Sequence, residues 1–362
     1  MGKFFGRNRC PERSCCRLCE WPAEDRRLWT ASLARGDLID GVGIRARYRP
    51  ISNRKTERGY GRWLTFADRN GWLNTGAPAD RITRAAVIEY VEHMRRLENS
   101  GHTILSRLQE LYEAATVMDP HRDWTWIRRI ASRVRATSKP ARDKRSKMVS
   151  SADLFKLGLE LMDRANSAST PRLGAIMFRD GLMIAVASLR PLRLKNLAAI
   201  GLKRHLARQG ERRWKLIFPS EELKNGDALE MPWPDMLVGH LNTWLNQWRP
   251  ILSGLRSRWV REIGDALWVS SHGSPMTMQG IYGRFVAQTK TAFGHAVNPH
   301  LFRDIAATTL ADFDPEHVRI AAPLLGHRDF RTTERYYLHA NMMKATRRYQ
   351  QELLRLRHRQ RD

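Results

Sequence analysis

The chain has 362 residues, which is too long for one average domain and fits two, and 42% of them are hydrophobic, enough for packed cores. Its longest mainly apolar run, Leu182 to Leu189, is far shorter than the roughly 20 residues that span a bilayer, and its first residues lack the apolar stretch of a secretory signal. The 63 lysines and arginines exceed the 37 acidic residues and give a charge of +26, so we expect a cytoplasmic protein that binds nucleic acid and no membrane.

Residues 1–45 are interpreted as an irregular leader that holds one short helix near Glu20 to Arg35. The leader contains all four cysteines of the chain, which are Cys10, Cys15, Cys16 and Cys19. The last two have the spacing of half a zinc site, but no second separated pair follows, and two adjacent cysteines make tetrahedral ligation awkward. A cysteine-rich surface leader is therefore favoured over a metal knot, and we expect no metal.

Residues 46–136 are predicted to form a compact bundle of four amphipathic helices. The first helix spans Arg54 to Arg69, and Thr83 is suited to cap the start of the second. The third runs from Thr103, and the fourth follows Asp123. Within each helix the apolar residues recur three or four positions apart, which places them on one face.

A linker separates this bundle from a larger second domain. Residues 137–149 are polar, rich in lysine and arginine, and broken by Pro140, which is typical of a solvated segment or of one that lies along a phosphate backbone. Residues 150–362 are mainly helical, and the helices are predicted at Ala152–Asn166, Arg172–Leu189, Asn196–Ile200, Met236–Ile251 and from Met278 onward.

The exception to the helical pattern is a small antiparallel sheet. Trp214–Phe218 and Ala228–Met231 are predicted as the strands of a hairpin, because the turn between them contains the dipeptide Asn225-Gly226. A third strand is expected at Ala266–Val269. The sequence thus predicts a mainly α fold with a small antiparallel sheet.

Five separated motifs follow one another in the second domain. They are Pro191-Leu192-Arg193, Leu223-Lys224-Asn225-Gly226, His300-Leu301-Phe302-Arg303, Leu324-Leu325-Gly326-His327 and, nine residues after that histidine, Tyr336 within Thr332-Thr333-Glu334-Arg335-Tyr336-Tyr337. Single motifs such as His-x-x-Arg arise often by chance, but the ordered set is specific. The set resembles the phage-integrase family, the tyrosine recombinases, over roughly residues 150–350. The helical bundle is similar in size to the family's core-binding (SAM-like) domain.

The resemblance implies a site-specific DNA recombinase or integrase that cuts and rejoins strands through a 3′-phosphotyrosine intermediate. It implies an N-terminal helical core-binding bundle, a tyrosine-recombinase catalytic domain, and a homo-tetramer on double-stranded DNA. No metal, ATP, other cofactor or small-molecule substrate is expected. The basic tail, residues 345–361, either packs onto a neighbouring protomer or stays a solvated helix.

The two motif arginines, Arg193 and Arg303, suit the stabilisation of a five-coordinate phosphorus. Extra negative charge gathers on the equatorial oxygens in that state, and a guanidinium offers them a planar fork that stays charged. By the resemblance, His327 donates a hydrogen bond to the same oxygens. These residues are therefore expected to bind the scissile phosphate.

Tyr336 is the expected nucleophile. A phenol has a pKa of about 10, so it needs proton removal and a positive pocket near neutral pH. By the resemblance, His300 helps to handle this proton. The departing 5′ oxygen needs a proton in turn, and Lys224 at the hairpin tip fits the general acid, with Lys215 inside the first strand as its competitor.

Three features depart from the family pattern or leave it ambiguous. Asn196 stands three residues after the first arginine, where the family usually has an acid, and Asp304 follows the second arginine, where histidine is often found. Tyr337, followed by Leu338-His339, resembles the family's Tyr-x-His and competes with Tyr336 as nucleophile. These departures put the level of activity in question.

Two other functions remain open. A type IB topoisomerase-like enzyme uses a similar residue set to relax DNA as a monomer, although the separate bundle and the Leu-Gly-His spacing argue against it. A non-catalytic DNA-binding protein derived from a recombinase would form no covalent complex. The sequence gives neither the DNA target site, nor accessory factors, nor the direction of the reaction.

Overall fold

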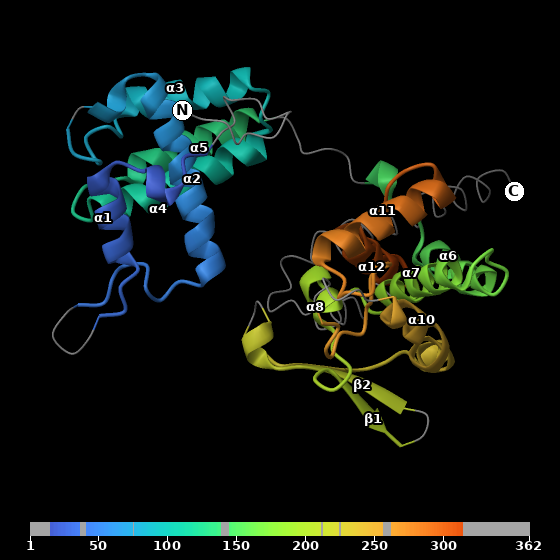
Figure 1. The fold of residues 1–362 in the computed structure, drawn as a ribbon. Helices are drawn as coiled ribbons and strands as arrows, with labels where there is room; N and C mark the ends of the chain where they lie inside the picture. Colours follow the sequence, from blue (N-terminus) through green and yellow to red (C-terminus); the bar gives the residue numbers. More distant parts are fainter. Residues whose placement is uncertain are drawn as a thin grey trace, which may run out of the picture. The chain divides into compact units, whose positions relative to one another are not determined.

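The computed structural model describes residues 15–36, 41–74, 76–138, 145–210, 213–223, 226–255 and 262–313. The chain divides into two compact units, Met1–Arg142 and Asp143–Asp362 (Figure 1). Each unit has a hydrophobic core of its own. The division falls within the segment that the sequence analysis assigns to the linker.

The first unit is a helical bundle. Its helices are α1 (Ala23–Ser32), α2 (Pro50–Arg69), α3 (Arg84–Arg96), α4 (Gly101–Met118) and α5 (Thr125–Thr137). The last four confirm the four predicted helices. The hydroxyl of Thr83 accepts a hydrogen bond from the amide of Ala86 at 3.2 Å, so it caps α3 as expected. Ser100 caps α4 in the same way.

The segment before α2, which the sequence analysis treats as a leader, contributes to the core of this unit. Trp21 and Trp29 are 3% and 0% exposed, and the ring centroids of Trp21 and Tyr60 lie 5.1 Å apart. The buried carboxylate of Asp25 in α1 accepts hydrogen bonds from the hydroxyl of Tyr60 and from Arg81, both at 2.7 Å. These contacts join α1 to the bundle.

Cys15 and Cys16 pack against α2, whereas Cys19 is exposed. The amide of Cys16 donates to the carbonyl of Gly61 at 3.2 Å and to the hydroxyl of Thr65 at 3.0 Å. Burial raises the pKa of the Cys16 thiol to about 11, which disfavours the thiolate that a metal ligand requires. Among the described residues no three His, Cys, Asp or Glu side chains are grouped to hold a metal ion. Cys10 lies outside these residues.

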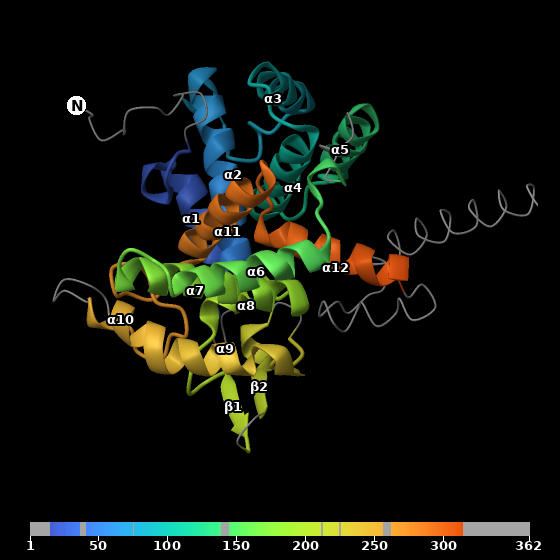
Figure 2. The same ribbon diagram turned by 90° about the vertical axis from the view of Figure 1, so that its right-hand side faces the viewer.

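The second unit is mainly helical. Its helices are α6 (Ser151–Ala165), α7 (Pro171–Leu189), α8 (Leu194–Ala199), α9 (Val238–Thr243), α10 (Arg249–Gly254), α11 (Met278–Phe293) and α12 (Pro299–Phe313). Figure 2 shows α6 and α7 lying side by side. A π-helical turn, η7 (Trp244–Trp248), joins α9 to α10, because Pro250 has no amide hydrogen for an α-helical bond. No described helix is both long and apolar enough to cross a membrane.

The sheet of the second unit has three antiparallel strands in the order β1 (Leu206–Gln209), β2 (Arg213–Phe218), β3 (Leu229–Pro232). The hairpin β2–β3 confirms the prediction. The predicted third strand at Ala266–Val269 is wrong, because this segment makes only isolated bridges, one of them between Val269 and Pro275. The amide of Ser270 bonds to the carbonyl of Ser274 at 2.7 Å, and this tight turn prevents a longer ladder.

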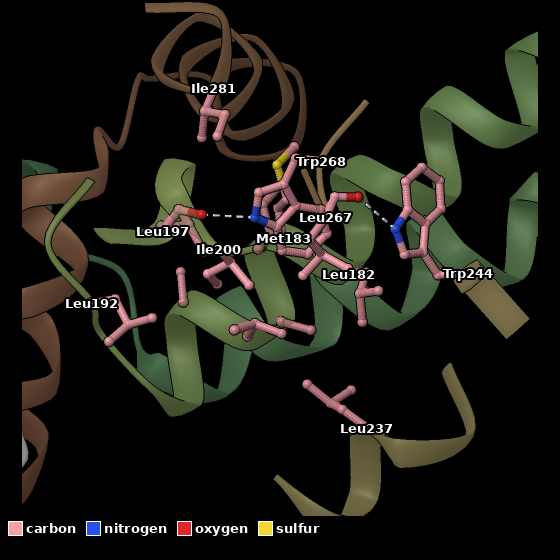
Figure 3. Packing of buried hydrophobic residues seen from close by; sticks show 14 of the residues in the cluster. Leu182, Met183, Leu192, Leu197, Ile200, Leu237, Trp244, Leu267, Trp268 and Ile281 are labelled. Carbon is pink, nitrogen blue, oxygen red and sulfur yellow. Dashed lines mark hydrogen bonds between the residues drawn. The ribbon is translucent and has the colours of Figure 1, made fainter. Parts of the chain in front are cut away.

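The core of the second unit surrounds α7, which is apolar along most of its length. Leu182 and Met183 are fully buried there, and they belong to the same hydrophobic cluster as Trp268 and Leu197 (Figure 3). The indole Nε1 of Trp268 donates to the carbonyl of Leu197 at 2.8 Å, and that of Trp244 donates to the carbonyl of Leu267 at 3.1 Å. The first of these bonds holds α8, which begins immediately after the first motif arginine.

Candidate active site

Arg193 lies where the chain leaves α7 and enters α8. Pro191 cannot continue α7, and the carbonyl of Arg193 then accepts the first helical bonds of α8, from the amides of Asn196 at 2.8 Å and Leu197 at 2.9 Å. Leu192 and Leu197 are 7% and 1% exposed, so both sides of the arginine are held in the core. Burial lowers the pKa of the Arg193 guanidinium below its ordinary value.

His300 and Arg303 lie in the first turn of α12. The side-chain oxygen of Asn298 accepts a hydrogen bond from the amide of His300 at 3.0 Å, which caps the start of this helix. His300 is exposed, whereas Arg303, three residues later on the same side of the helix, is 7% exposed. The ring of Phe302 packs 5.1 Å from that of Phe285, centroid to centroid, and anchors the turn to α11.

The structure brings Arg193 and Arg303 together. The Nη1 of Arg303 donates to the carbonyl of Pro191, which is 112 residues away in the sequence. Burial and then the charge of Arg193 lower the pKa of Arg303 to about 10, and the carboxylate of Asp304 opposes this shift. Two cations held close together in a half-buried place cost free energy, which a bound anion would relieve.

The other predicted residues lie outside the part of the chain that the structure describes. These are Lys224, His327, Tyr336 and the alternative nucleophile Tyr337. The structure describes the residues on either side of the Lys224-Asn225 pair, and the amide of Gly226 donates a hydrogen bond to the carbonyl of Leu223 at 3.2 Å. Lys215, the competing general acid, forms an ion pair with Glu230 of the neighbouring strand β3.

The two departures from the family pattern are both buried. Asn196 in α8 and Asp304 in α12 are each 7% exposed. Asp304 follows the second arginine and raises its pKa, so an acid at this position helps to keep that guanidinium charged. Asn196 has no charge with which to do the same for Arg193.

Sequence reasoning missed a polar pair beside this site. The Nε2 of His205 lies 2.8 Å from Oε2 of Glu222, and Glu222 stands two residues before Lys224. The two residues are 17 positions apart and belong to no motif, so nothing in the sequence pattern joins them.

A basic groove of about 490 Å³ opens between α2 and α4 of the first unit. Its cations are Arg54, Lys55, Arg58, Arg62 and Arg107. The acid in its lining, Glu110, is buried and accepts hydrogen bonds from Ser106, at 3.1 Å, and from Arg107. Three of the arginines repeat every four residues along one face of α2, so the groove presents a row of positive charge.

Comparison with models of protein families identifies the family of the chain. The model of the phage integrase family matches residues 159–344, a range that contains all six predicted catalytic positions. The chain belongs to the phage integrase family. The predicted resemblance is thereby confirmed.

The chain is similar to solved structures of recombinases. The XerH site-specific recombinase bound to a palindromic difH substrate, in a post-cleavage complex, is 12% identical with a TM-score of 0.53, covering 83% of this chain and 79% of XerH. The pre-cleavage complex of XerH with difH is 14% identical, with a TM-score of 0.45 over 89% of this chain and 95% of that one. XerA recombinase is 15% identical, with a TM-score of 0.39, and the match covers 91% of this chain and 99% of XerA. The chain matches no curated protein.

The likeness to the post-cleavage XerH complex supports the predicted fold class. At 12% identity it shows the fold alone, which is a mainly helical chain with a small three-stranded antiparallel sheet. That fold is the one of the tyrosine recombinases, with an N-terminal helical domain and a catalytic domain.

Proposed function

We propose that the chain is a site-specific recombinase or integrase that cuts and rejoins double-stranded DNA through a 3′-phosphotyrosine. The observation that carries the proposal is the meeting of Arg193 and Arg303 at the start of α8 and the first turn of α12. Two guanidinium groups can bind the equatorial oxygens of one phosphate, and they bind the five-coordinate state more strongly than the ground state. Membership of the phage integrase family supports the same reaction.

In the proposed reaction the phenol oxygen of Tyr336 attacks the phosphorus, and the bond from phosphorus to the 5′ oxygen breaks. His300 takes part in removing the phenol proton, and Lys224 gives a proton to the 5′ oxygen. His327 donates a hydrogen bond to the phosphate. The 5′ hydroxyl of a second strand then attacks the phosphotyrosine, which rejoins DNA and frees the tyrosine without ATP or metal.

We propose further that the basic groove of the first unit contacts the DNA backbone. Lys55 and Arg107 form ion pairs with Glu110, whereas Arg54, Arg58 and Arg62 are available to replace the counterions of the phosphates, so affinity should fall as salt rises. The XerH structure that shares this fold is bound to a palindromic difH substrate, which agrees with DNA as the partner. A homo-tetramer would bring four such active sites to two duplexes.

A covalent trapping experiment tests the proposal. Bound sequences are first selected from a pool of random duplex DNA, and the selected site is then nicked near the cleavage point, so that the cut fragment diffuses away. The wild-type chain should form an adduct that survives denaturation, and peptide mapping should place it on Tyr336. Tyr336→Phe should lose the adduct and keep binding. An undiminished adduct in that variant would assign the nucleophile to Tyr337, and no adduct in the wild type would refute the proposal.

A further inference from the structure

The imidazole of His205 is buried at the start of β1, where both of its nitrogens have partners. The amide of Gly201 donates to Nδ1 at 2.9 Å, so Nδ1 carries no proton, and Nε2 donates to Oε2 of Glu222 at 2.8 Å. The ring also packs against Phe218 at the end of β2, with 4.8 Å between the ring centroids. His205 is 3% exposed, which leaves its ring little freedom to move.

Glu222 makes contacts with three other residues. Besides His205, its carboxylate forms an ion pair with Arg204. Its backbone carbonyl accepts a hydrogen bond from Nζ of Lys195 at 3.4 Å, and Lys195 stands in α8 two residues after Arg193. The side chain and the backbone of Glu222 therefore connect the loop after β2 to the start of β1 and to the helix that follows the first motif arginine.

This loop continues directly into the residue that we propose as the general acid. Leu223 is 4% exposed, and its carbonyl accepts the amide of Gly226, whose φ of +72° a glycine adopts without strain. The described residues on the two sides of Lys224, Leu223 and Gly226, are thus bonded to each other, and Leu223 is anchored in the core. A lysine side chain has several freely rotating bonds, so anchoring the residue that precedes it in the chain lowers the entropy lost when Nζ reaches the leaving oxygen.

We propose that the His205–Glu222 contact positions Lys224 for proton transfer to the departing 5′ oxygen. This inference rests on the proposed function, in which Lys224 is the general acid. His205 and Glu222 are positioning residues, because they act through Lys224 and need not touch DNA. The contact should matter for the protonation of the leaving group and for no other step.

A substrate with sulfur in place of the bridging 5′ oxygen isolates that step. When the phenol attacks, the bond from phosphorus to sulfur breaks, and the thiolate leaves without a proton because a thiol has a pKa of only about 8.5. Single-turnover cleavage is measured on matched nicked sites with oxygen or sulfur at the phosphate that the wild-type chain cuts. A defect in the general acid slows cleavage of the oxygen substrate only.

Glu222→Ala should slow cleavage of the oxygen substrate by about tenfold or more and leave the sulfur substrate within about twofold of wild type. Lys224→Ala should give the same pattern. Glu222→Gln keeps an oxygen that accepts from His205 and should restore most of the rate. Glu221→Ala removes the neighbouring exposed carboxylate and serves as the matched control, with both substrates cut at the wild-type rate.

The outcomes separate this inference from the proposed function. Equal slowing of both substrates by Glu222→Ala, or no slowing of either, would overturn the positioning role. If that variant fails to fold, Glu222→Asp keeps the charge but shortens the reach by one methylene, and it should still slow the oxygen substrate selectively. A wild-type chain that cuts neither substrate would refute the recombinase activity itself.

Discussion

Arg303 donates a hydrogen bond to the carbonyl of Pro191, two residues before Arg193. The acceptor is neutral, so the bond orients the guanidinium of Arg303 without cancelling its charge. The same bond ties the first turn of α12 to the segment between α7 and α8. One backbone carbonyl thereby sets the spacing of the two cations that we propose to bind the scissile phosphate.

Arg303→Lys tests whether geometry, beyond charge, is needed at this position. An ammonium group cannot bond to the carbonyl of Pro191 and also present a planar fork to phosphate oxygens. We expect covalent cleavage to fall about 100-fold and DNA affinity to stay within about twofold. Rates come from single-turnover assays and affinities from fluorescence anisotropy. Arg213→Lys, at an exposed site in β2, is the control, and equal cleavage by both variants would contradict the prediction.

Inorganic phosphate should bind to the arginine pair in the absence of DNA. Burial and the charge of Arg193 lower the pKa of Arg303 to about 10, so Arg303 is still charged at pH 7.5, and an anion bound between the two guanidinium groups relieves their repulsion. Phosphate that binds the folded chain raises its Tm. Thermal unfolding with increasing phosphate should show a smaller rise for Arg303→Ala than for the wild type. The same rise in both proteins would place the bound anion elsewhere.

Arginines of the basic groove should govern affinity for DNA of any sequence. Arg54→Ala together with Arg58→Ala removes two cations from one face of α2. The slope of log K against log salt should become shallower by about 1 for each phosphate that the variant no longer neutralises. Arg27→Ala on α1 is the control, since its guanidinium already pairs with Glu24 at 2.6 Å. Titrations at several salt concentrations measure both slopes, and an unchanged slope in the double variant would exclude the groove from DNA binding.

Gly61→Ala should destabilise the protein, although alanine favours a helix over glycine by about 1 kcal/mol. A methyl group at residue 61 would lie 2.2 Å from the carbonyl oxygen of Cys16, which is backbone and cannot move aside cheaply. Gly283→Ala, on the open side of α11, meets nothing within 4 Å and should stabilise by about 0.5 to 1 kcal/mol. Unfolding in urea measures the change in the free energy of unfolding for each variant. A more stable Gly61→Ala variant would show that the backbone at Cys16 moves away to make room for the methyl group.

Much of the helical framework is predictable from local signals. Thr83 is recognisable as a helix cap because a short hydroxyl side chain suits the free amides of a first turn. The hairpin β2–β3 follows from its Asn-Gly turn and its apolar first strand. Strand β1 cannot be predicted in this way, because Leu206–Gln209 contains no β-branched or aromatic residue. This segment is a strand because it pairs with β2.

Contacts between distant segments lie beyond local pattern. Trp21 and Trp29 stand in a mainly polar stretch, and their size is the signal that could assign them to a core. The meeting of Arg193 and Arg303 is expected only from the order of the family motifs, since no spacing rule joins residues so far apart. The contact between His205 and Glu222 has no such motif and depends on the fold.

Helix α8 has six residues, too few to be stable by itself in water. Its far end is secured by the indole of Trp268 in the hydrophobic interior, through the bond to Leu197. The position of Arg193 at its near end therefore depends on a buried tryptophan that lies 75 residues further along the chain.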